Sequence, residues 1–198
     1  MNPTPRHRDE PRPSDPRRAE RGTALIEFTL MLPLLLVLVF GVMDFGHLVE
    51  QRMILTNVCR EGGSLGSRED PLDPNLINVL VASGKPLNLS GADGEVVVTK
   101  LKAGTSVASP KPTISQQVTI GGLGTPSGVS EKLVNDGLTT NLYQHLVFNA
   151  ANNTADISQV TVVEVFYKYR PITPLSILFN GMLTRDGGGL NLSSRAVY

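Results

Sequence analysis

The sequence predicts an α+β fold: a long N-terminal helix, transmembrane in its first part, whose outer half packs against a small antiparallel sheet with short helices. Three observations support this prediction. A predominantly apolar run occupies residues 23–43. Apolar residues at helical spacing continue beyond it to about residue 61. From residue 64 onward, short β-branched or alternating segments are separated by Gly, Pro, Asn and Asp, which is typical of strands joined by turns.

The composition excludes several classes of function. The 198 residues carry 18 basic and 18 acidic side chains, which argues against a nucleic-acid partner bound through a bulk positive field. A single cysteine, Cys59, excludes an intrachain disulfide framework and a multi-cysteine zinc site. The absence of tryptophan argues against a platform for stacking bases. The length suits one domain with appendages.

Residues 1–22 are predicted to be a disordered, basic cytoplasmic leader. They contain six arginines and four acidic residues, a net charge of about +2, and no aliphatic residue larger than Ala19 follows Met1. Such a segment cannot bury enough apolar surface to offset the entropy of ordering it. The rest of the chain carries a net charge of about −2, so the zero total is a cancellation between unlike segments.

Residues 23–43 are predicted to cross a lipid bilayer as the first part of the N-terminal helix. Glu27 is their only charged residue, and none occurs between it and Asp44. At 1.5 Å per residue the segment spans about 31 Å, the hydrocarbon thickness of a bilayer. The arginine-rich leader belongs on the cytoplasmic side, so the chain beyond residue 43 faces outward.

Three interpretations of this segment compete. A secretory signal peptide would have a shorter apolar run closed by a small-x-small cleavage site, which is absent before Asp44. A plain membrane anchor accounts for the apolar run but not for Glu27 or the abrupt boundary at Gly22. A processed filament subunit accounts for both.

The boundary between leader and helix carries the most specific motif. It reads Arg21-Gly22-Thr23-Ala24-Leu25-Ile26-Glu27-Phe28, so a basic leader ends in glycine and Glu-Phe opens the apolar helix. This resembles the processing site of type IV prepilins of the Tad (Flp-type) branch. With Leu-Pro-Leu-Leu-Leu, Asp44-Phe45-Gly46 and Arg60-Glu61-Gly62-Gly63 downstream, the segment resembles the N-terminal domain of TadE-like minor pilins, or pseudopilins, over about a quarter of the chain.

The resemblance implies that an inner-membrane prepilin peptidase cuts after Gly22, with Glu27 and Phe28 as recognition residues. The cut creates an α-amine on Thr23, which is protonated at neutral pH because its reference pKa is about 8. The resemblance also implies that Glu27 pairs with this amine on a neighbouring subunit and sets the filament register, because a lone charge in an apolar interior is costly. In the alternative interpretation, Glu27 snorkels to the membrane interface.

The function implied is that of a structural subunit or assembly component of a Tad pilus used in adherence or secretion. The expected partners are the peptidase, other Tad pilins or pseudopilins, the Tad assembly machinery and the lipid bilayer. The expected location is the inner membrane, with a periplasmic or extracellular C-terminal domain, and possible entry into the pilus. The alternative is an uncleaved single-pass membrane protein whose extracytoplasmic domain binds another envelope component.

The N-terminal helix is predicted to continue outward over residues 44–61, with Gly62 and Gly63 as its stop. Pro33 removes one helical hydrogen bond and is predicted to kink the membrane helix. Asp44, His47, Glu50 and Gln51 are expected on faces other than the packed one, with His47 in solvent. Cys59 is predicted to be an inert core thiol. The predicted packing stripe consists of Phe45, Leu48, Val49, Leu55 and Cys59.

The head, residues 64–198, is predicted to combine strands and short helices. Strands are expected at 95–101, 114–120, 157–169 and 190–198, and a glycine-rich surface loop at 121–128. Helices are expected at 75–82, capped by Asp73, at 130–148 and at 175–183. The cluster of Val165, Phe166, Tyr167, Tyr169 and Ile172 is interpreted as core strand.

No catalytic or ligand-binding constellation is recognised in the sequence. The loop at 121–128 lacks the Gly-Lys-Ser/Thr ending of a phosphate-binding loop, and the three histidines have no metal-ligand spacing. No nucleophile motif is present. The chain is therefore expected to be a substrate of the peptidase, not an enzyme, and to need no cofactor.

Overall fold

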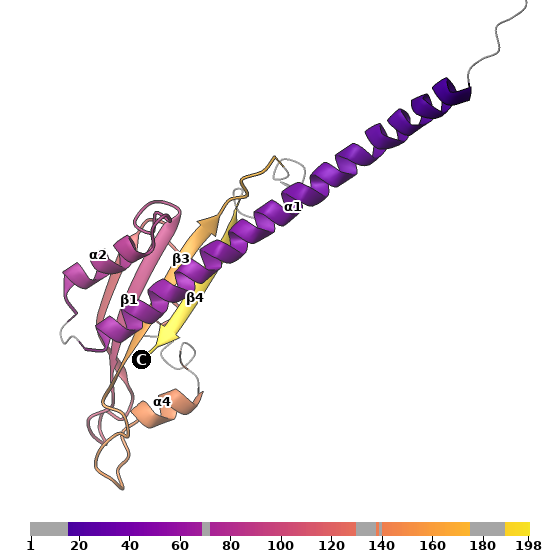
Figure 1. The fold of residues 1–198 in the computed structure, drawn as a ribbon. Coiled ribbons are helices and arrows are strands. Elements are labelled where there is room, and N and C mark those ends of the chain that lie inside the picture. The colour runs from indigo at the N-terminus through magenta and orange to yellow at the C-terminus, as the bar shows by residue number, and fades with distance from the viewer. Residues whose placement is uncertain (1–15, 69–71, 130–137, 139, 175–188) are drawn as a thin grey trace, which may run out of the picture. The chain divides into compact units, whose positions relative to one another are not determined.

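The computed structural model describes residues 16–68, 72–129, 138, 140–174 and 189–198. It has the predicted α+β fold: a long helix, a four-stranded antiparallel sheet and short helices (Figure 1). The chain divides into two compact units, residues 1–42 and 43–198. The predicted helix at 175–183, and residues 130–137 and 139 of the one predicted at 130–148, lie outside the described residues.

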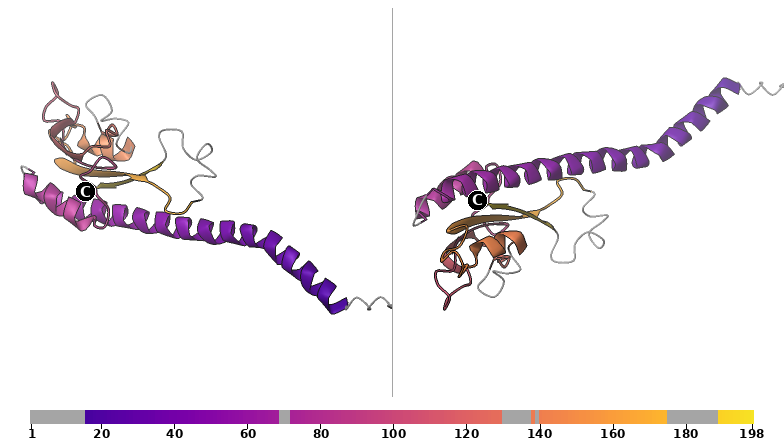
Figure 2. Two further views of the ribbon diagram at one scale, coloured as in Figure 1. Left: turned by 90° about the horizontal axis from the view of Figure 1, so that it is seen from above. Right: turned by 90° about the horizontal axis from the view of Figure 1, so that it is seen from below.

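Helix α1 extends from Pro16 to Gly66 and is longer than predicted at both ends. Its backbone is already helical at residues 16–22, within the segment for which a disordered leader is predicted. Pro33 lies inside the helix, and the indigo part of α1 is visibly bent (Figure 2). Proline removes one backbone donor and crowds the preceding turn, which favours a bend in a helix.

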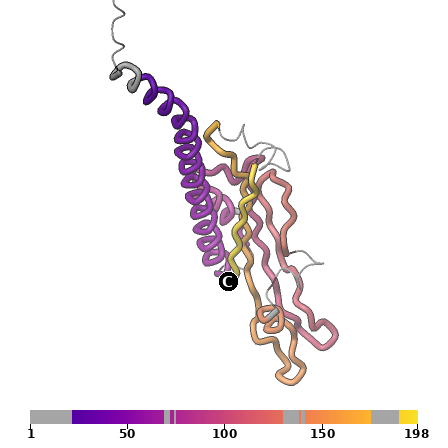
Figure 3. Tube along the Cα trace, turned by 90° about the vertical axis from the view of Figure 1, so that its right-hand side faces the viewer, coloured from indigo at the N-terminus to yellow at the C-terminus, as the bar shows by residue number. Residues whose placement is uncertain are grey.

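The four strands have the order β2-β1-β3-β4, and all neighbours are antiparallel (Figure 3). Central strand β1 (Gly94–Lys102) is almost wholly buried, central strand β3 (Gln159–Tyr169) is buried or half-buried along its length, and the two are the strands richest in valine. Edge strand β2 (Thr113–Gly121) alternates between exposed and half-buried residues, as its alternating sequence predicts. Strand β4 (Leu190–Val197) forms the other edge. All four confirm the predicted strands to within two residues at each end.

Two short helices flank the sheet. Helix α2 (Pro74–Ser83) begins after the predicted N-cap Asp73, whose carboxylate accepts a hydrogen bond from the backbone of Asn75 at 2.9 Å, and ends at Gly84. Helix α4 (Thr140–Leu146) is the described part of the helix predicted at 130–148. We call the sheet face that packs against α1 and α2 the inner face, and the opposite face, on which α4 lies, the outer face (Figure 2).

Each face of the sheet has its own apolar core. The inner core joins α1, α2 and the strands through fully buried residues such as Leu55, Leu80 and Val163. The outer core joins Leu101, Val160 and Val162 of the strands to residues of the loops and of α4. The inner core is therefore the contact that holds residues 43–66 of α1 on the sheet.

The packed face of α1 differs from the predicted stripe. Leu55 and Cys59 are buried as predicted, whereas Phe45 is 68% exposed and Val49 39% exposed. Asp44 and His47 are instead half-buried and Gln51 is buried, so the prediction that they lie on other faces is wrong. Asp44 has polar partners in the head, at Ile172 and Thr173, which the helical period cannot indicate.

Gly62 and Gly63 do not end α1, which continues to Gly66. A Cβ on Gly62 would lie 2.8 Å from Leu80 Cδ1 and 3.1 Å from Val163 Cγ1, and one on Gly63 would lie 1.9 Å from the ring of Tyr198. The two glycines are therefore contact points at which the helix approaches α2 and the sheet, and the prediction of a glycine stop is wrong.

Candidate functional site

The motif residues Gly22, Thr23, Glu27 and Phe28 all lie in α1 and are exposed. A Cβ added to Gly22 would meet nothing within 4 Å, so this position is open on all sides within the protein. Glu27 follows Thr23 by four residues, which places the two on one helix face about 6 Å apart along the axis. This part of α1 can therefore present its residues to another molecule.

The helix that follows the motif exposes an unusually large apolar surface. Among the described residues, one helix is long and apolar enough to span a membrane, and its apolar window is wholly exposed. Its exposed side chains include Leu30 at 77% and Leu38 at 66%. Contiguous apolar surface of this extent marks a membrane or protein contact. The prediction that residues 23–43 can serve as a membrane anchor is consistent with this surface.

Asp44, the first charged residue after the apolar run, joins α1 to the segment that follows β3. Its carboxylate accepts hydrogen bonds from the backbone N–H groups of Ile172 (3.1 Å) and Thr173 (3.2 Å) and from the Thr173 hydroxyl (2.5 Å). Its carbonyl accepts a hydrogen bond from the Tyr169 hydroxyl at 2.9 Å. Burial, and secondly the Asp44 carboxylate, raise the pKa of Tyr169, so this hydroxyl stays a donor at neutral pH. We call this set of contacts the Asp44 clamp.

One turn further along α1, His47 and Gln51 are hydrogen-bonded to each other within the helix, and the His47 ring contacts the head. Their Nε2 atoms lie 2.7 Å apart, and the His47 ring is tilted against that of Tyr169 with 6.1 Å between centroids. His47 Nδ1 lies 3.5 Å from Glu50. His47 is therefore part of the interface between α1 and the head, which corrects its prediction as a solvated residue.

Cys59 is a free, buried thiol in the inner core, as predicted. Its Sγ lies 3.2 Å from the carbonyl oxygen of Ser194 on β4. Burial raises the pKa of Cys59 from 9.0 to about 11. The thiol is therefore protonated at neutral pH, and a protonated, buried thiol is a poor nucleophile.

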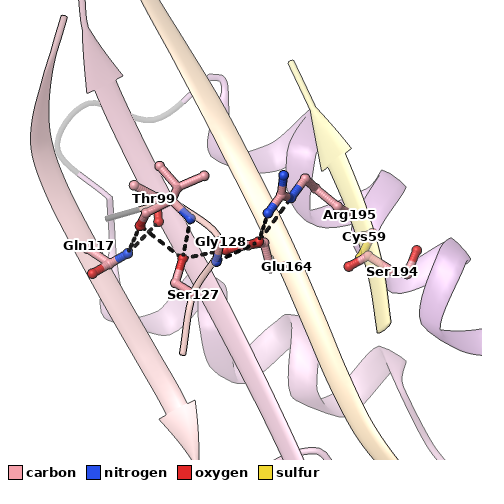
Figure 4. Close-up of polar contacts among 9 residues, drawn as sticks. Cys59, Thr99, Gln117, Ser127, Gly128, Glu164, Ser194 and Arg195 are labelled. Carbon is pink, nitrogen blue, oxygen red and sulfur yellow. Dashed lines mark hydrogen bonds and ion pairs between the residues drawn. The ribbon is translucent and has the colours of Figure 1, made fainter. Parts of the chain in front are cut away.

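The outer face of the sheet carries a buried polar network (Figure 4). Glu164 on β3, which is 2% exposed, accepts hydrogen bonds from Arg195 Nε at 2.9 Å, from the backbone of Gly128 at 3.2 Å and from the Ser127 hydroxyl. Gln117 donates to Thr99 and to the carbonyl of Val129. These contacts hold the loop at 122–129 on the sheet, in agreement with its prediction as a glycine-rich loop.

Among the described residues, the histidine outside α1, His145, also has a local partner. His145 Nδ1 lies 2.9 Å from Asp156, and both side chains are about half exposed. In the part of the chain that the structure describes, no three His, Cys, Asp or Glu residues come together as possible metal ligands. The cluster predicted as core strand is divided: Val165 and Tyr169 are buried, Phe166 and Tyr167 half-buried, and Ile172 is 68% exposed.

Sequence reasoning located the motif at residues 22–28 but missed the Asp44 clamp and the Glu164 network. Asp44 was singled out only through the segment Asp44-Phe45-Gly46. Its partner Thr173 lies 129 residues away, and Glu164 binds residues 31 and 37 positions away, so no local pattern announces these contacts.

Comparison with known proteins supports the motif. Residues 22–64 match the family model described as TadE-like protein. No curated protein and no solved structure gives a significant match to the chain.

Proposed function

We propose that this chain, whose residues 22–64 match the TadE-like family model, is a structural subunit or assembly component of a Tad pilus. In this proposal a prepilin peptidase cuts the chain after Gly22. The TadE-like region supports a role related to the Tad pilus in general. Processing after Gly22 is supported by the position of Gly22, Glu27 and Phe28. All three are exposed at the start of an exposed apolar helix. The chemistry belongs to the peptidase, and this chain is its substrate.

The proposed location is the inner membrane, with residues 23–43 spanning the bilayer and the head outside the cytoplasm. The arginines of residues 1–22 favour a cytoplasmic N-terminus, since positive residues flanking a membrane helix are retained on that side. After cleavage, the mature subunit enters, primes or tips a pilus used for adherence or secretion, together with other Tad pilins and the assembly machinery.

A second candidate function is supported by the backbone at the proposed cleavage site. Helix α1 runs without interruption from Pro16 through the bond between Gly22 and Thr23. A peptidase acts on extended backbone, so cleavage requires this first part of the helix to unwind. If it does not unwind, the chain is an uncleaved single-pass membrane protein whose head binds another envelope component.

N-terminal sequencing of the protein extracted from membranes separates the two candidates. We expect the wild-type chain to begin at Thr23, and we expect Gly22→Leu to retain the leader because leucine adds a bulky side chain beside the bond that is cut. The matched control is Gly41→Leu in the same helix, where the space around the Cβ is equally open, and which should be processed normally. A wild-type chain that begins at Met1 in cells with an active peptidase would overturn the processing proposal.

A further inference from the structure

Three exposed apolar residues are neighbours of the Asp44 clamp in the chain, through a backbone hydrogen bond or through strand pairing. Phe45, the next residue of α1, is 68% exposed, Ile172 is 68% exposed, and Leu190 is 45% exposed. Ile172 donates its backbone N–H to Asp44, and Leu190 pairs with Tyr169, whose hydroxyl donates to the Asp44 carbonyl. Each of the three is thus either part of the clamp, next to it in the sequence or paired with one of its residues on the neighbouring strand. We call them the apolar rim.

The apolar rim is placed where the apolar run of α1 ends. Asp44 is the first charged residue after sixteen uncharged ones. A residue that is hydrogen-bonded to Asp44 therefore lies next to the point at which the apolar run ends. Ile172 is such a residue, and the clamp holds it with its side chain exposed.

Two charged groups near the rim have partners among the described residues. Arg170 Nη2 lies 2.7 Å from Asp93 Oδ1, and the Asp44 carboxylate accepts a hydrogen bond from the Thr173 hydroxyl. In the described part of the chain, the rim thus offers apolar side chains beside an Arg–Asp ion pair. A partner that covers it gains mainly from burying apolar surface.

We propose that the apolar rim is a membrane-contact surface that rests on the outer interface of the same bilayer that residues 23–43 cross. The proposal depends on the proposed membrane span. Apolar side chains at the end of a membrane helix partition into the interface between headgroups and acyl chains, and a paired charge beside them remains among the headgroups. Because the Asp44 clamp fixes the 172–173 segment to α1, it is the contact that keeps Ile172 at the bilayer surface.

The test uses the full chain in vesicles of phosphatidylcholine and phosphatidylglycerol. An environment-sensitive fluorophore is attached to Ile172→Cys in a Cys59→Ala background, and quenching is measured with lipids that carry a nitroxide near the top of the acyl chain. We expect the fluorophore at 172 to be quenched. The matched control is Val107→Cys, an exposed apolar position (73%) in the loop after β1 at the other end of the sheet, which should not be quenched.

A third reporter, Val42→Cys, separates failure of this inference from failure of the proposed span. If position 42 is quenched and position 172 behaves like position 107, the membrane-contact surface is overturned and the span stands. If position 42 is not quenched either, both fail. If position 172 is shielded from water but insensitive to the lipid nitroxide, a protein covers the rim, which also overturns the proposal.

Removal of the clamp tests its positioning role. Asp44→Ala removes the acceptor of three hydrogen bonds, so quenching at 172 should fall while quenching at a Phe45→Cys reporter, which remains on α1, should persist. The control is Glu61→Ala, an exposed acid on the same helix that lies well beyond the Asp44 clamp in the sequence. Equal loss in both variants, or no loss in Asp44→Ala, would refute the role of Asp44.

Discussion

Glu27 is the residue on which filament assembly depends in the proposed function. It is exposed in a helix whose other described residues from 23 to 43 are uncharged. A carboxylate in this position is costly to bury unless a cation pairs with it, and the amine released at Thr23 of a neighbouring subunit is such a cation. Replacement of Glu27 should therefore affect assembly and leave the helix intact.

We expect Glu27→Val to be cleaved after Gly22 but to be lost from pili sheared off the cell. The measurement is the fraction of processed subunit found in the sheared pili. Thr29→Val is the control, because it makes a similar change two residues away, where the hydroxyl bonds only to the helix backbone at Leu25. Normal incorporation of Glu27→Val would refute the register role.

The buried thiol of Cys59 should make the stability of the folded protein depend on pH. Its pKa is raised by burial from 9.0 to about 11, so the folded state favours the protonated thiol. The corresponding stability is present in full below pH 9 and is lost as the pH rises towards 11; two pKa units correspond to about 3 kcal/mol. Unfolding of the detergent-solubilised protein should show this loss, and Cys59→Ala should lack it.

The difference between wild type and Cys59→Ala is the quantity to measure, because the raised pKa values of Tyr167 and Tyr169 affect both proteins equally. Below pH 9 the two should differ by a constant amount. A difference that stays constant up to pH 11 would contradict the assignment of Cys59 as a buried, protonated thiol.

At the scale of elements, α1 contains two kinds of glycine. Gly41 and Gly46 are open, since an added Cβ meets nothing within 4 Å. Gly62 faces Leu80 and Val163, both fully buried, at distances that a Cβ cannot occupy without displacing them. An open glycine affects only the conformational freedom of the helix backbone. A glycine such as Gly62, which faces buried side chains, determines how closely the helix approaches α2 and the sheet.

The same substitution should therefore have opposite effects at the two kinds of site. Gly46→Ala should stabilise by up to about 1 kcal/mol through helix propensity. Gly62→Ala should lose about 1 kcal/mol net, because overpacking costs about 1–3 kcal/mol and exceeds that gain. Thermal unfolding of the two variants should differ by several degrees. Equal melting temperatures would show that Leu80 can move aside freely.

At the scale of the whole molecule, the two units have opposite surfaces. Described side chains between residues 22 and 42 are mostly apolar and almost all exposed, whereas the unit at 43–198 buries many of its valines and leucines between helices and sheet. A bilayer around the first unit and water around the second would satisfy both. The charge of residues 1–22 then sets the direction of insertion.

This orientation can be tested with a membrane-impermeant thiol reagent. Val107→Cys should be labelled from outside the inner membrane, because the head faces outward. Ser14→Cys, placed in the Gly22→Leu chain so that the leader is retained, should be labelled only after the membrane is disrupted. Buried Cys59 should contribute no background. The reverse pattern would invert the proposed topology.

Local patterns allowed much of this protein to be predicted. The apolar run, the motif at residues 22–28, the strands and the N-cap at Asp73 each depend on neighbours within a few residues, so they can be recognised in the sequence. The extent of α1 was underestimated because Gly62 and Gly63 are weak helix formers that tertiary packing retains in the helix.

The sequence by itself determined that a basic segment precedes an apolar helix and that a head of antiparallel strands follows, because charge, hydropathy and side-chain period are local properties. Only the tertiary structure decided which face of α1 is buried. Around residues 44–51 apolar and polar side chains occur on every side of the helix, so the period is ambiguous. The choice there depends on contacts more than a hundred residues away, from Asp44 to Thr173 and from Cys59 to Ser194, which no local pattern contains.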